Sequence, residues 1–357
     1  MFVTGCHRSG TSLLASLLHD CLPQKQQDQE HLVPAMDNPQ GFFESRRLVD
    51  LNNEMLTWIG SEWYRPPLSS PLWDRAPLLD LLVKKREQLR DLALNHCWVD
   101  KDPRLCITYP AYLHLLLRRV PIVSILREPL DVATSLYARN GTPVDCGLAI
   151  WFLYNHLLSI SIDQQDYMIG YNELLEGVGT FSTRNTYHWI CEVLEQIQVP
   201  KPTDFTWQQI SDSRLRPELN RAASALPQTE RSKVDLELLK VLEQAYKLIR
   251  EGGFSIEDFK FAFNSMPYVV LNTLFKYQAV SFLDPRLVNQ NQTLRNTVSD
   301  LERQRDTQIQ QLTELNTTLK SAQQRELALQ EKLHCMQASS SWKITSPLRQ
   351  FGDFFRS

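Results

Sequence analysis

The sequence lacks the features of a disulfide framework, a zinc site or a membrane protein. Its seven cysteines are scattered, and no two of them form a C-x-x-C pair, so reduced thiols in a cytoplasmic protein are expected. No apolar run approaches the ~20 residues that a helix needs to span a bilayer, and no signal peptide precedes the first apolar segment. We therefore expect a cytoplasmic protein without a membrane span.

A strong net charge is also absent. The formal charge of the 357 residues is −3, which gives no reason to expect nucleic acid as a partner. Apolar residues make up 43% and charged residues 22% of the chain, as in an ordinary globular protein. The length is sufficient for one large domain or two smaller ones with a full core.

The first dozen residues predict a phosphate-binding loop. Residues 2–4 are β-prone, residues 5–10 are bracketed by glycines, and residues 13–18 form an apolar helical run. The glycines let several backbone N–H groups point at one anion, and the following helix adds partial positive charge. The sequence therefore predicts a strand, an anion-binding loop and a helix in direct succession.

The cation of this loop is an arginine. The spacing Gly-x4-Gly matches the P-loop of nucleotide triphosphatases, but Thr11 stands where that motif has a lysine. Arg8 lies inside the loop and supplies the positive charge instead. Such a loop suits one phosphate that carries a further group better than a triphosphate with Mg²⁺.

A second motif follows the clearest buried strand, which is predicted over residues 121–126. Arg127 at the strand end offers a planar fork of donors to a phosphate. Pro129 favours the first turn of a helix, where Asp131 also suits the helix dipole. Ser135 lies about two turns beyond Arg127 and carries a hydroxyl. The alternative is a plain strand–turn–helix with a surface arginine.

Both motifs resemble those of sulfotransferases that use 3′-phosphoadenosine 5′-phosphosulfate (PAPS). Residues 5–14 are similar to the family's 5′-phosphosulfate loop, in the branch with an arginine in the loop that includes tyrosylprotein sulfotransferases and many bacterial members. Residues 127–135 resemble its 3′-phosphate motif, Arg-x-Pro-x-Asp-x-x-x-Ser. The resemblance covers roughly residues 1–250. It implies a P-loop NTPase-like three-layer α/β fold with a central parallel sheet.

The resemblance also implies roles for three charged residues. Glu44 follows a Gly-aromatic-aromatic run and is the implied general base for an acceptor hydroxyl; a helix-start glutamate is the alternative. Lys101, at the end of a strand predicted over residues 97–100, would stabilise charge on the bridging oxygen as the S–O bond breaks; a solvated cation is the alternative. Arg8 completes the catalytic set. The implied PAPS-binding residues are Gly5, Arg8, Ser9, Gly10, Thr11, Ser12, Arg127, Ser135 and Tyr171, and no metal is expected.

The remaining pattern predicts helices, one more strand and two functional loops. Tyr171 begins a segment similar to the family's Tyr-Glu-Asp-Leu-Leu, with Asn172 in place of the usual glutamate. No counterpart of the Arg-Lys-Gly element of cytosolic sulfotransferases is found. A substrate-side loop is expected over residues 58–77, and an irregular stretch over 200–229 that contains a nucleotide lid at 211–216. The helices are predicted at 48–56, 78–94, 112–119, 147–160, 187–196 and 234–250, and the strand at 166–171.

The C-terminal part predicts a coiled coil. From Leu294 to Met336, mostly apolar residues alternate in steps of four and three, with three polar interruptions in the a/d seam. A helix that is polar on its other faces needs a partner, so a homo-oligomer is expected; a disordered or single-helix linker is the alternative. The expected domains are a sulfotransferase domain over 1–285, a coiled coil over 286–337 and a tail over 338–357.

The favoured function is transfer of a sulfuryl group from PAPS to a hydroxyl or amine. The acceptor is expected to be a glycan or another cell-surface precursor, bound among residues 58–77 and 200–230. A P-loop kinase is the first alternative, and it would need the missing loop lysine and an acidic Mg²⁺ ligand at a strand end. A non-catalytic scaffold that serves the coiled coil is the second, and the complete motifs argue against it.

Overall fold

The structure is a computed structural model that describes residues 1–22, 43–89, 98–176, 186–215, 228–231, 233–281 and 285–345. The chain divides into two compact units, Met1–Phe282 and Leu283–Ser357. Several predictions fall outside the described residues: the Gly-aromatic pair at 41–42, the end of the helix expected over 78–94, Cys97 in an expected strand, Arg216 in the expected lid, and the tail after residue 345.

The first unit is built on a four-stranded parallel sheet, as expected for an α/β protein. The strands lie in the order β2-β1-β3-β4. Because all four strands are parallel, their carboxyl ends meet at one edge, which is where open α/β sheets bind ligands. The strands are β1 (Phe2–Thr4), β2 (Asp100–Lys101), β3 (Ile122–Leu126) and β4 (Tyr167–Gly170).

β2 and β4 differ from their predicted bounds at both ends. β1 and β3 are confirmed within one residue. β2 is later and shorter than predicted, and Lys101 pairs with Val3 inside the strand instead of following it. β1, the neighbour of β2, is itself only three residues long, so the ladder of hydrogen bonds between β1 and β2 is short. β4 ends at Gly170 because Tyr171 already belongs to the next helix.

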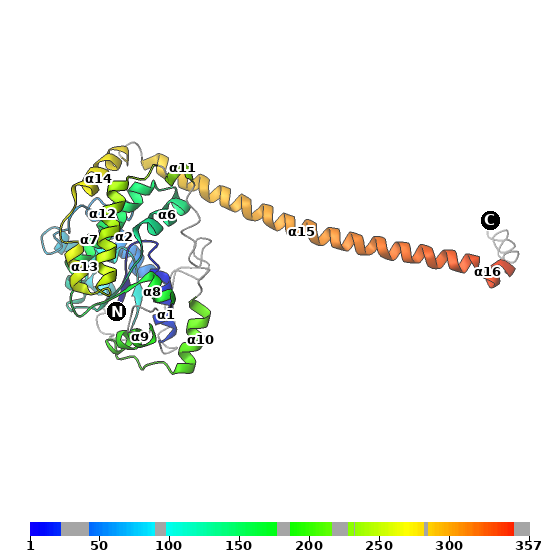
Figure 1. The fold of residues 1–357 in the computed structure, drawn as a ribbon, viewed down its shortest axis with the longest axis horizontal. Helices are drawn as coiled ribbons and strands as arrows, with labels where there is room; N and C mark the ends of the chain where they lie inside the picture. Colours follow the sequence, from blue (N-terminus) through cyan, green and yellow to red (C-terminus); the bar gives the residue numbers. More distant parts are fainter. Residues whose placement is uncertain are drawn as a thin grey trace. The chain divides into compact units, whose positions relative to one another are not determined.

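Alternating strand residues enter two separate hydrophobic cores. Phe2 and Ile122 pack into one cluster of buried side chains, whereas their neighbours Val3 and Val123 pack into the other. Successive side chains of a strand point to opposite faces, so apolar residues at every position require helices on both faces of the sheet. The sheet is therefore the middle layer of the first unit (Figure 1).

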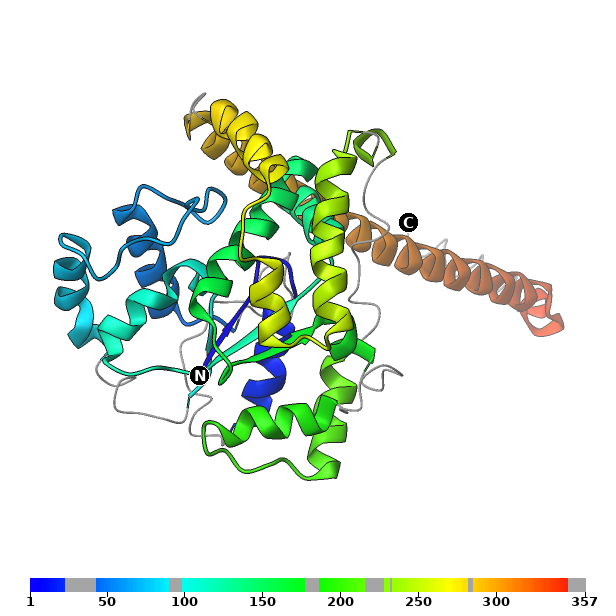
Figure 2. The same cartoon turned by 60° about the vertical axis from the view of Figure 1, so that its left-hand side comes forward.

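Helices cover both faces of the sheet (Figures 1 and 2). One core contains side chains from α1 (Thr11–Asp20), α8 (Tyr171–Glu176), α9 (Thr186–Glu195) and α10 (Asp204–Arg214). The other core contains side chains from α2 (Arg46–Trp58), α3 (Leu78–Lys85), α5 (Leu105–Leu116), α6 (Pro129–Asn140), α7 (Val144–Ser161), α12 (Leu236–Glu251), α13 (Ile256–Ala262) and α14 (Tyr268–Ser281). Two short elements complete the unit, the 3₁₀ helix η2 (Arg86–Leu89) and α11 (Gln228–Arg231).

Three segments differ from the sequence prediction of helices. The helix expected over 112–119 is α5, which begins at Leu105 and ends at Leu116. The helix expected from residue 78 ends at Lys85 and continues as η2, where Arg86 donates from Nη2 to the carbonyl of His114 at 2.9 Å. The stretch from residue 200 is not irregular, because α10 begins after Thr203, whose hydroxyl accepts from the backbone N–H of Thr206 at 3.2 Å. Ile210 is the residue that α10 buries, so the apolar pattern was too weak to predict this helix.

The second unit contains a single long helix followed by a short one. α15 runs from Pro285 to Ala338, 54 residues, and α16 spans Ser340–Ile344. Its continuity confirms that the heptad pattern is helical. The leucines of the seam from Leu312 to Leu333, together with Met336, are more than half exposed. In the described part of the chain, no helix is both long and apolar enough to cross a membrane.

Candidate functional site

The loop between β1 and α1 has a backbone that only glycines allow at two positions. Gly5 has a φ of +144°, and a Cβ there would lie 2.5 Å from the carbonyl oxygen of Ile125. Gly10 has a φ of +97°, and a Cβ there would lie 2.4 Å from the ring of Tyr171. Both conformations are in the region that favours glycine. The loop thus fits closely between β3 and Tyr171, directly before the N-terminus of α1.

The two predicted phosphate motifs meet at the ends of neighbouring strands. Arg8 donates from Nε to the hydroxyl oxygen of Ser135 at 2.9 Å. Arg127 donates from Nη1 to the backbone carbonyl of Arg8 at 3.2 Å. These residues are more than 100 positions apart in the chain, and the pairing of β1 with β3 brings them together. The site therefore holds two guanidinium groups and a hydroxyl within one network.

Arg127 is held from several sides. Its side chain is largely buried, and its guanidinium carbon lies 4.2 Å from the centroid of the Tyr171 ring. Its Nη2 is 3.4 Å from a carboxylate oxygen of Asp131, and its backbone carbonyl accepts from the indole of Trp151 at 2.9 Å. An aromatic face and an ion pair fix the planar group. The structure thus brings Tyr171 together with the motif it was predicted to join.

The remaining predicted loop residues lie where the chain enters α1. Thr11 is the first residue of this helix and is buried, and Ser12 is half-buried. The Ser9 hydroxyl is buried and, among the described residues, has no hydrogen-bond partner. Buried polar atoms are rarely left unpaired, so the loop retains an unused donor beside the helix N-terminus.

Glu44 and Lys101 form a buried ion pair. Lys101 donates from Nζ to Glu44 Oε1, and the side chains are 2% and 11% exposed for Lys101 and Glu44. Burial raises the pKa of the Glu44 carboxyl above its ordinary value, and the attraction of Lys101 opposes this shift. Neither residue is a solvated surface charge, which removes the alternative stated for Lys101. The structure brings together the two residues predicted to act on the transferring group.

The N-terminus of α2 is anchored to β2 by a buried carboxylate that sequence reasoning did not identify. Asp100 accepts at Oδ1 from the backbone N–H of Ser45 at 3.1 Å and from that of Lys101 at 2.8 Å. Its Oδ2 accepts from the Ser45 hydroxyl. Burial raises the pKa of Asp100 to about 6, although these hydrogen bonds lower it. Asp100 therefore fixes Glu44, the residue before Ser45, relative to Lys101.

A second missed carboxylate, Asp102, is bound on both oxygens. Asn52 donates from Nδ2 to its Oδ2 at 2.8 Å, and the backbone N–H and Nη1 of Arg104 each donate to its Oδ1 at 2.9 Å. The signal available in the sequence was Asn52 itself, a polar residue at an apolar position of the predicted α2 pattern. It is fully buried, and it also accepts from the hydroxyls of Thr108 and Tyr112.

His7 was not predicted as a site residue, although it lies in the loop. Its side chain is buried between the rings of Trp63 and Tyr154, at centroid distances of 4.9 and 5.3 Å. Its Nε2 has no hydrogen-bond partner in the described part of the chain. Burial lowers the pKa of His7 well below 6.5, and nearby arginines and Lys101 lower it further.

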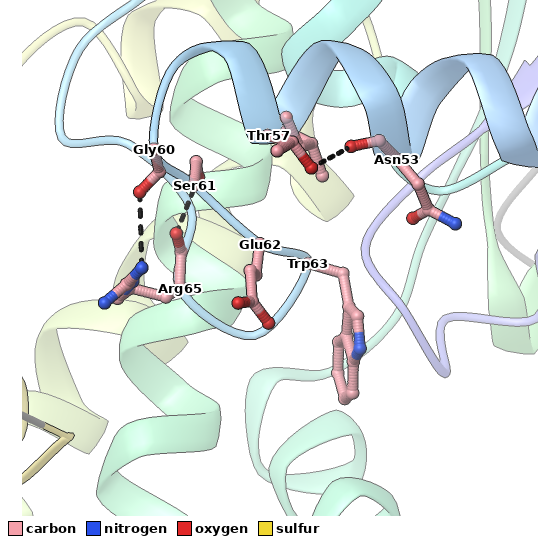
Figure 3. Close-up of a pocket in the computed structure, with 8 residues that line it drawn as sticks. Asn53, Thr57, Gly60, Ser61, Glu62, Trp63 and Arg65 are labelled. Carbon is pink, nitrogen blue, oxygen red and sulfur yellow. Dashed lines mark hydrogen bonds between the residues drawn. The ribbon is translucent and has the colours of Figure 1, made fainter. Parts of the chain in front are cut away.

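A hollow of about 320 Å³ is lined in part by Trp63, one of the residues that pack against His7 (Figure 3). It lies at the C-terminal end of α2 and in the turn that follows, where the Ser61 hydroxyl donates to the carbonyl of Arg65 at 2.7 Å. Trp63 belongs both to this hollow and to the rings around His7. The hollow thus falls within the expected substrate-side loop. Its lining residues are Asn53, Leu56, Thr57, Gly60, Ser61, Glu62, Trp63 and Arg65.

Comparison with known proteins assigns no family. No protein-family model matches the sequence, and no curated protein matches it at a significant level. The chemistry of the site must therefore be argued from its own residues. At the carboxyl edge of the sheet the site combines an anion-binding loop, the guanidinium groups of Arg8 and Arg127, and a lysine paired with a carboxylate that burial makes more basic. Such a set can bind an anion, stabilise a leaving oxygen and accept a proton.

Proposed function

We propose that the protein is a PAPS-dependent sulfotransferase that acts on a hydroxyl or amine. The observation that carries this proposal is the hydrogen bond from Arg8 to Ser135, because it joins the loop expected to hold the 5′-phosphosulfate to the motif expected to hold the 3′-phosphate. A ligand with two anionic groups on one nucleoside fits an arrangement with two arginines that follow the ends of neighbouring strands. The sheet of the first unit is compatible with a P-loop NTPase-like fold.

The residues that would hold PAPS are those of the two motifs. The loop amides and Arg8 would bind the phosphosulfate, together with the unpaired Ser9 hydroxyl. Arg127, clamped against Tyr171 and Asp131, would bind the 3′-phosphate in a fixed orientation. PAPS supplies an activated sulfuryl group, in which sulfur is bonded to a phosphate oxygen that can leave.

The ion pair of Glu44 and Lys101 provides the remaining chemistry. Glu44 would accept the proton of the acceptor hydroxyl while the acceptor oxygen forms a bond to sulfur. Lys101 would neutralise the negative charge that appears on the bridging oxygen as its bond to sulfur breaks. The products are the sulfated acceptor and 3′-phosphoadenosine 5′-phosphate (PAP), with the proton on Glu44. The pair must separate for both residues to act, because each now neutralises the other.

The alternative function, a P-loop kinase, receives less support from this geometry. The acidic residue nearest to a strand end is Asp102, and both of its oxygens already accept hydrogen bonds from Asn52 and Arg104. A Mg²⁺ ligand needs a carboxylate oxygen that faces the phosphates. The position of the missing loop lysine is occupied by Thr11, which is buried at the start of α1.

Calorimetry with PAP tests the proposal. We expect Arg127→Ala to weaken PAP binding by about tenfold to a few hundred-fold, because a hydrogen bond to a charged group contributes about 1.5–3 kcal/mol. Arg75→Ala is the matched control, since the Arg75 side chain is 76% exposed beside Asp74, and it should bind PAP like the wild type. ATP with Mg²⁺ should not compete at comparable concentration. Unchanged PAP affinity in a folded Arg127→Ala variant would refute the 3′-phosphate assignment.

A further inference from the structure

The two neighbours His7 and Arg8 face different parts of the site. Arg8 donates to Ser135 on α6, towards the residues expected to bind the nucleotide. His7 packs against Trp63, which belongs to the turn after α2, and against Tyr154 on α7. The Tyr154 hydroxyl donates to the carbonyl of Trp63 at 2.7 Å, so the surroundings of His7 are ordered. The loop thus has a side expected to bind the nucleotide and, at His7, a second side that packs against Trp63, one of the residues that line the hollow.

The buried imidazole on this second side is incompletely satisfied. His7 is 8% exposed, and no described residue hydrogen-bonds its Nε2. A buried polar atom without a hydrogen-bond partner destabilises the folded protein, and in a native structure such an atom calls for an explanation, of which a catalytic or binding role is one. The ring of Trp63, on the turn after α2, packs against the imidazole of His7. This turn lines the hollow.

His7 and Glu44 share the same charged neighbours. Lys101 and Arg104 are among the charges that act on both side chains. Burial first, and then the positive charges around it, lower the pKa of His7 and keep its ring neutral in the free protein, so it can donate or accept one hydrogen bond at Nε2 without adding a charge. A neutral hydrogen-bonding group that shares its charged neighbours with a carboxylate base suits a hydroxyl better than a phosphate.

We propose that His7 binds the acceptor hydroxyl through Nε2 and is a specificity-determining residue of the site; this inference rests on the proposed sulfuryl transfer. A hydroxyl has one proton and two lone pairs. With the imidazole proton on Nε2, His7 donates to one lone pair, the hydroxyl proton points to Glu44, and the second lone pair attacks sulfur. His7 leaves the reaction unchanged, and its function is to orient the attacking oxygen.

Three substitutions at His7 test this role. His7→Gln keeps a side-chain N–H near the position of Nε2, His7→Asn places its amide near Nδ1, and His7→Ala removes the group. The probes are PAP, measured by calorimetry, and PAPS with water as the acceptor, measured as release of inorganic sulfate. We expect PAP affinity within twofold of the wild type in all three variants. Sulfate release should fall about tenfold in His7→Ala and His7→Asn, and His7→Gln should retain at least a third of it.

The outcomes separate this inference from the function on which it rests. A wild type that binds no PAP overturns the proposed function and this inference with it. A wild type that binds PAP and releases no sulfate from PAPS contradicts the positioning of water at His7, while the proposed transfer to another acceptor stands. A wild type that binds PAP and releases sulfate, with three variants that release sulfate equally fast, overturns the role of His7 alone. The role of His7 is also overturned if His7→Gln releases sulfate as slowly as His7→Asn, because His7 would then be a structural residue. It is overturned as well if PAP affinity falls along with turnover, because His7 would then belong to the nucleotide side of the loop.

Discussion

At the scale of single residues, the ion pair of Glu44 and Lys101 stabilises the folded site but, in the proposed reaction, holds both groups in an inactive state. Each side chain compensates the buried charge of the other, and removal of one partner of a buried pair costs about 3–5 kcal/mol. In the proposed reaction the same pairing keeps both groups from acting. An acceptor hydroxyl beside Glu44 and developing charge beside Lys101 provide replacement partners. The resting pair therefore preserves two reactive groups until substrates arrive.

The substitution Glu44→Gln tests the base. It preserves shape and removes the proton-accepting carboxylate, so turnover should fall by about 10²–10⁴, whereas PAP affinity should stay nearly unchanged. Glu54→Gln on the same helix is the control, because Glu54 pairs with Lys85 at 2.7 Å and is 41% exposed. Steady-state release of sulfate or sulfated product measures the effect. A loss of less than tenfold would assign the base to another residue.

At the scale of elements, α2 depends on β2 for its position. Asp100 accepts hydrogen bonds from the backbone N–H and the hydroxyl of Ser45, the N-cap residue of α2, and thereby holds the preceding residue, Glu44, in place. In the unfolded chain Asp100 titrates near 3.8, and in the folded protein near 6. The folded state therefore binds the proton of Asp100 more strongly than the unfolded state does. The stabilisation of the folded state by this difference is complete below pH 3.8 and is lost as the pH rises through 6.

Asp100→Asn should remove this pH dependence. Asn Oδ1 can accept from the same two backbone N–H groups, and its amide can donate to Ser45. Relative to the variant, the unfolding free energy of the wild type should fall by roughly 3 kcal/mol between pH 4 and 7, from a shift of about two pKa units. Denaturant titrations at several pH values measure this difference. Asp50 is exposed on α2, so the unfolding free energy of Asp50→Asn should depend on pH in the same way as that of the wild type. If the unfolding free energy of Asp100→Asn also followed the wild type at every pH, the raised pKa of Asp100 would be contradicted.

The sequence predicted those parts of the elements that depend on local pattern. The strand before each phosphate motif, α6 opening at Pro129 and the long helix α15 follow from apolar periodicity and helix-start signals. The link between Asp100 and Ser45 joins positions 55 apart, and the burial of His7 needs Trp63 and Tyr154. Such contacts depend on how whole elements pack, which no local pattern contains.

At the scale of the whole molecule, the two units differ in how far their apolar side chains are buried. The first unit buries its own two cores. Along α15, apolar side chains stay in solvent, among them Leu312, Leu315 and Leu319, which are 62%, 70% and 55% exposed. Burial of apolar surface contributes about 25 cal/mol per Å², so these residues gain most from a partner helix. We propose that the partner is a second copy, because the seam has heptad spacing and the positions beside it mix acids, bases and glutamines, so that charge does not oppose self-pairing.

Deletion of the chain after residue 281 tests this assembly. The deleted protein should be a folded monomer that binds PAP, because both phosphate motifs lie in the first unit. The full chain should be a dimer or a higher oligomer by light scattering at micromolar concentration. Replacing Leu312 and Leu319 by lysine should convert it to a monomer, whereas lysine at the exposed positions Gln311 and Thr318 should not. A monomeric full chain would exclude self-association.

The position of β1 affects the order in which the site can form during synthesis. β1 precedes the other strands in the chain but lies between β2 and β3 in the sheet. The ribosome releases it before either neighbour exists, and a three-residue strand cannot persist alone. The hydrogen bond from Arg8 to Ser135 needs a segment that emerges more than 100 residues later. Nascent chains that end before α6 should therefore expose the glycine loop without anion affinity.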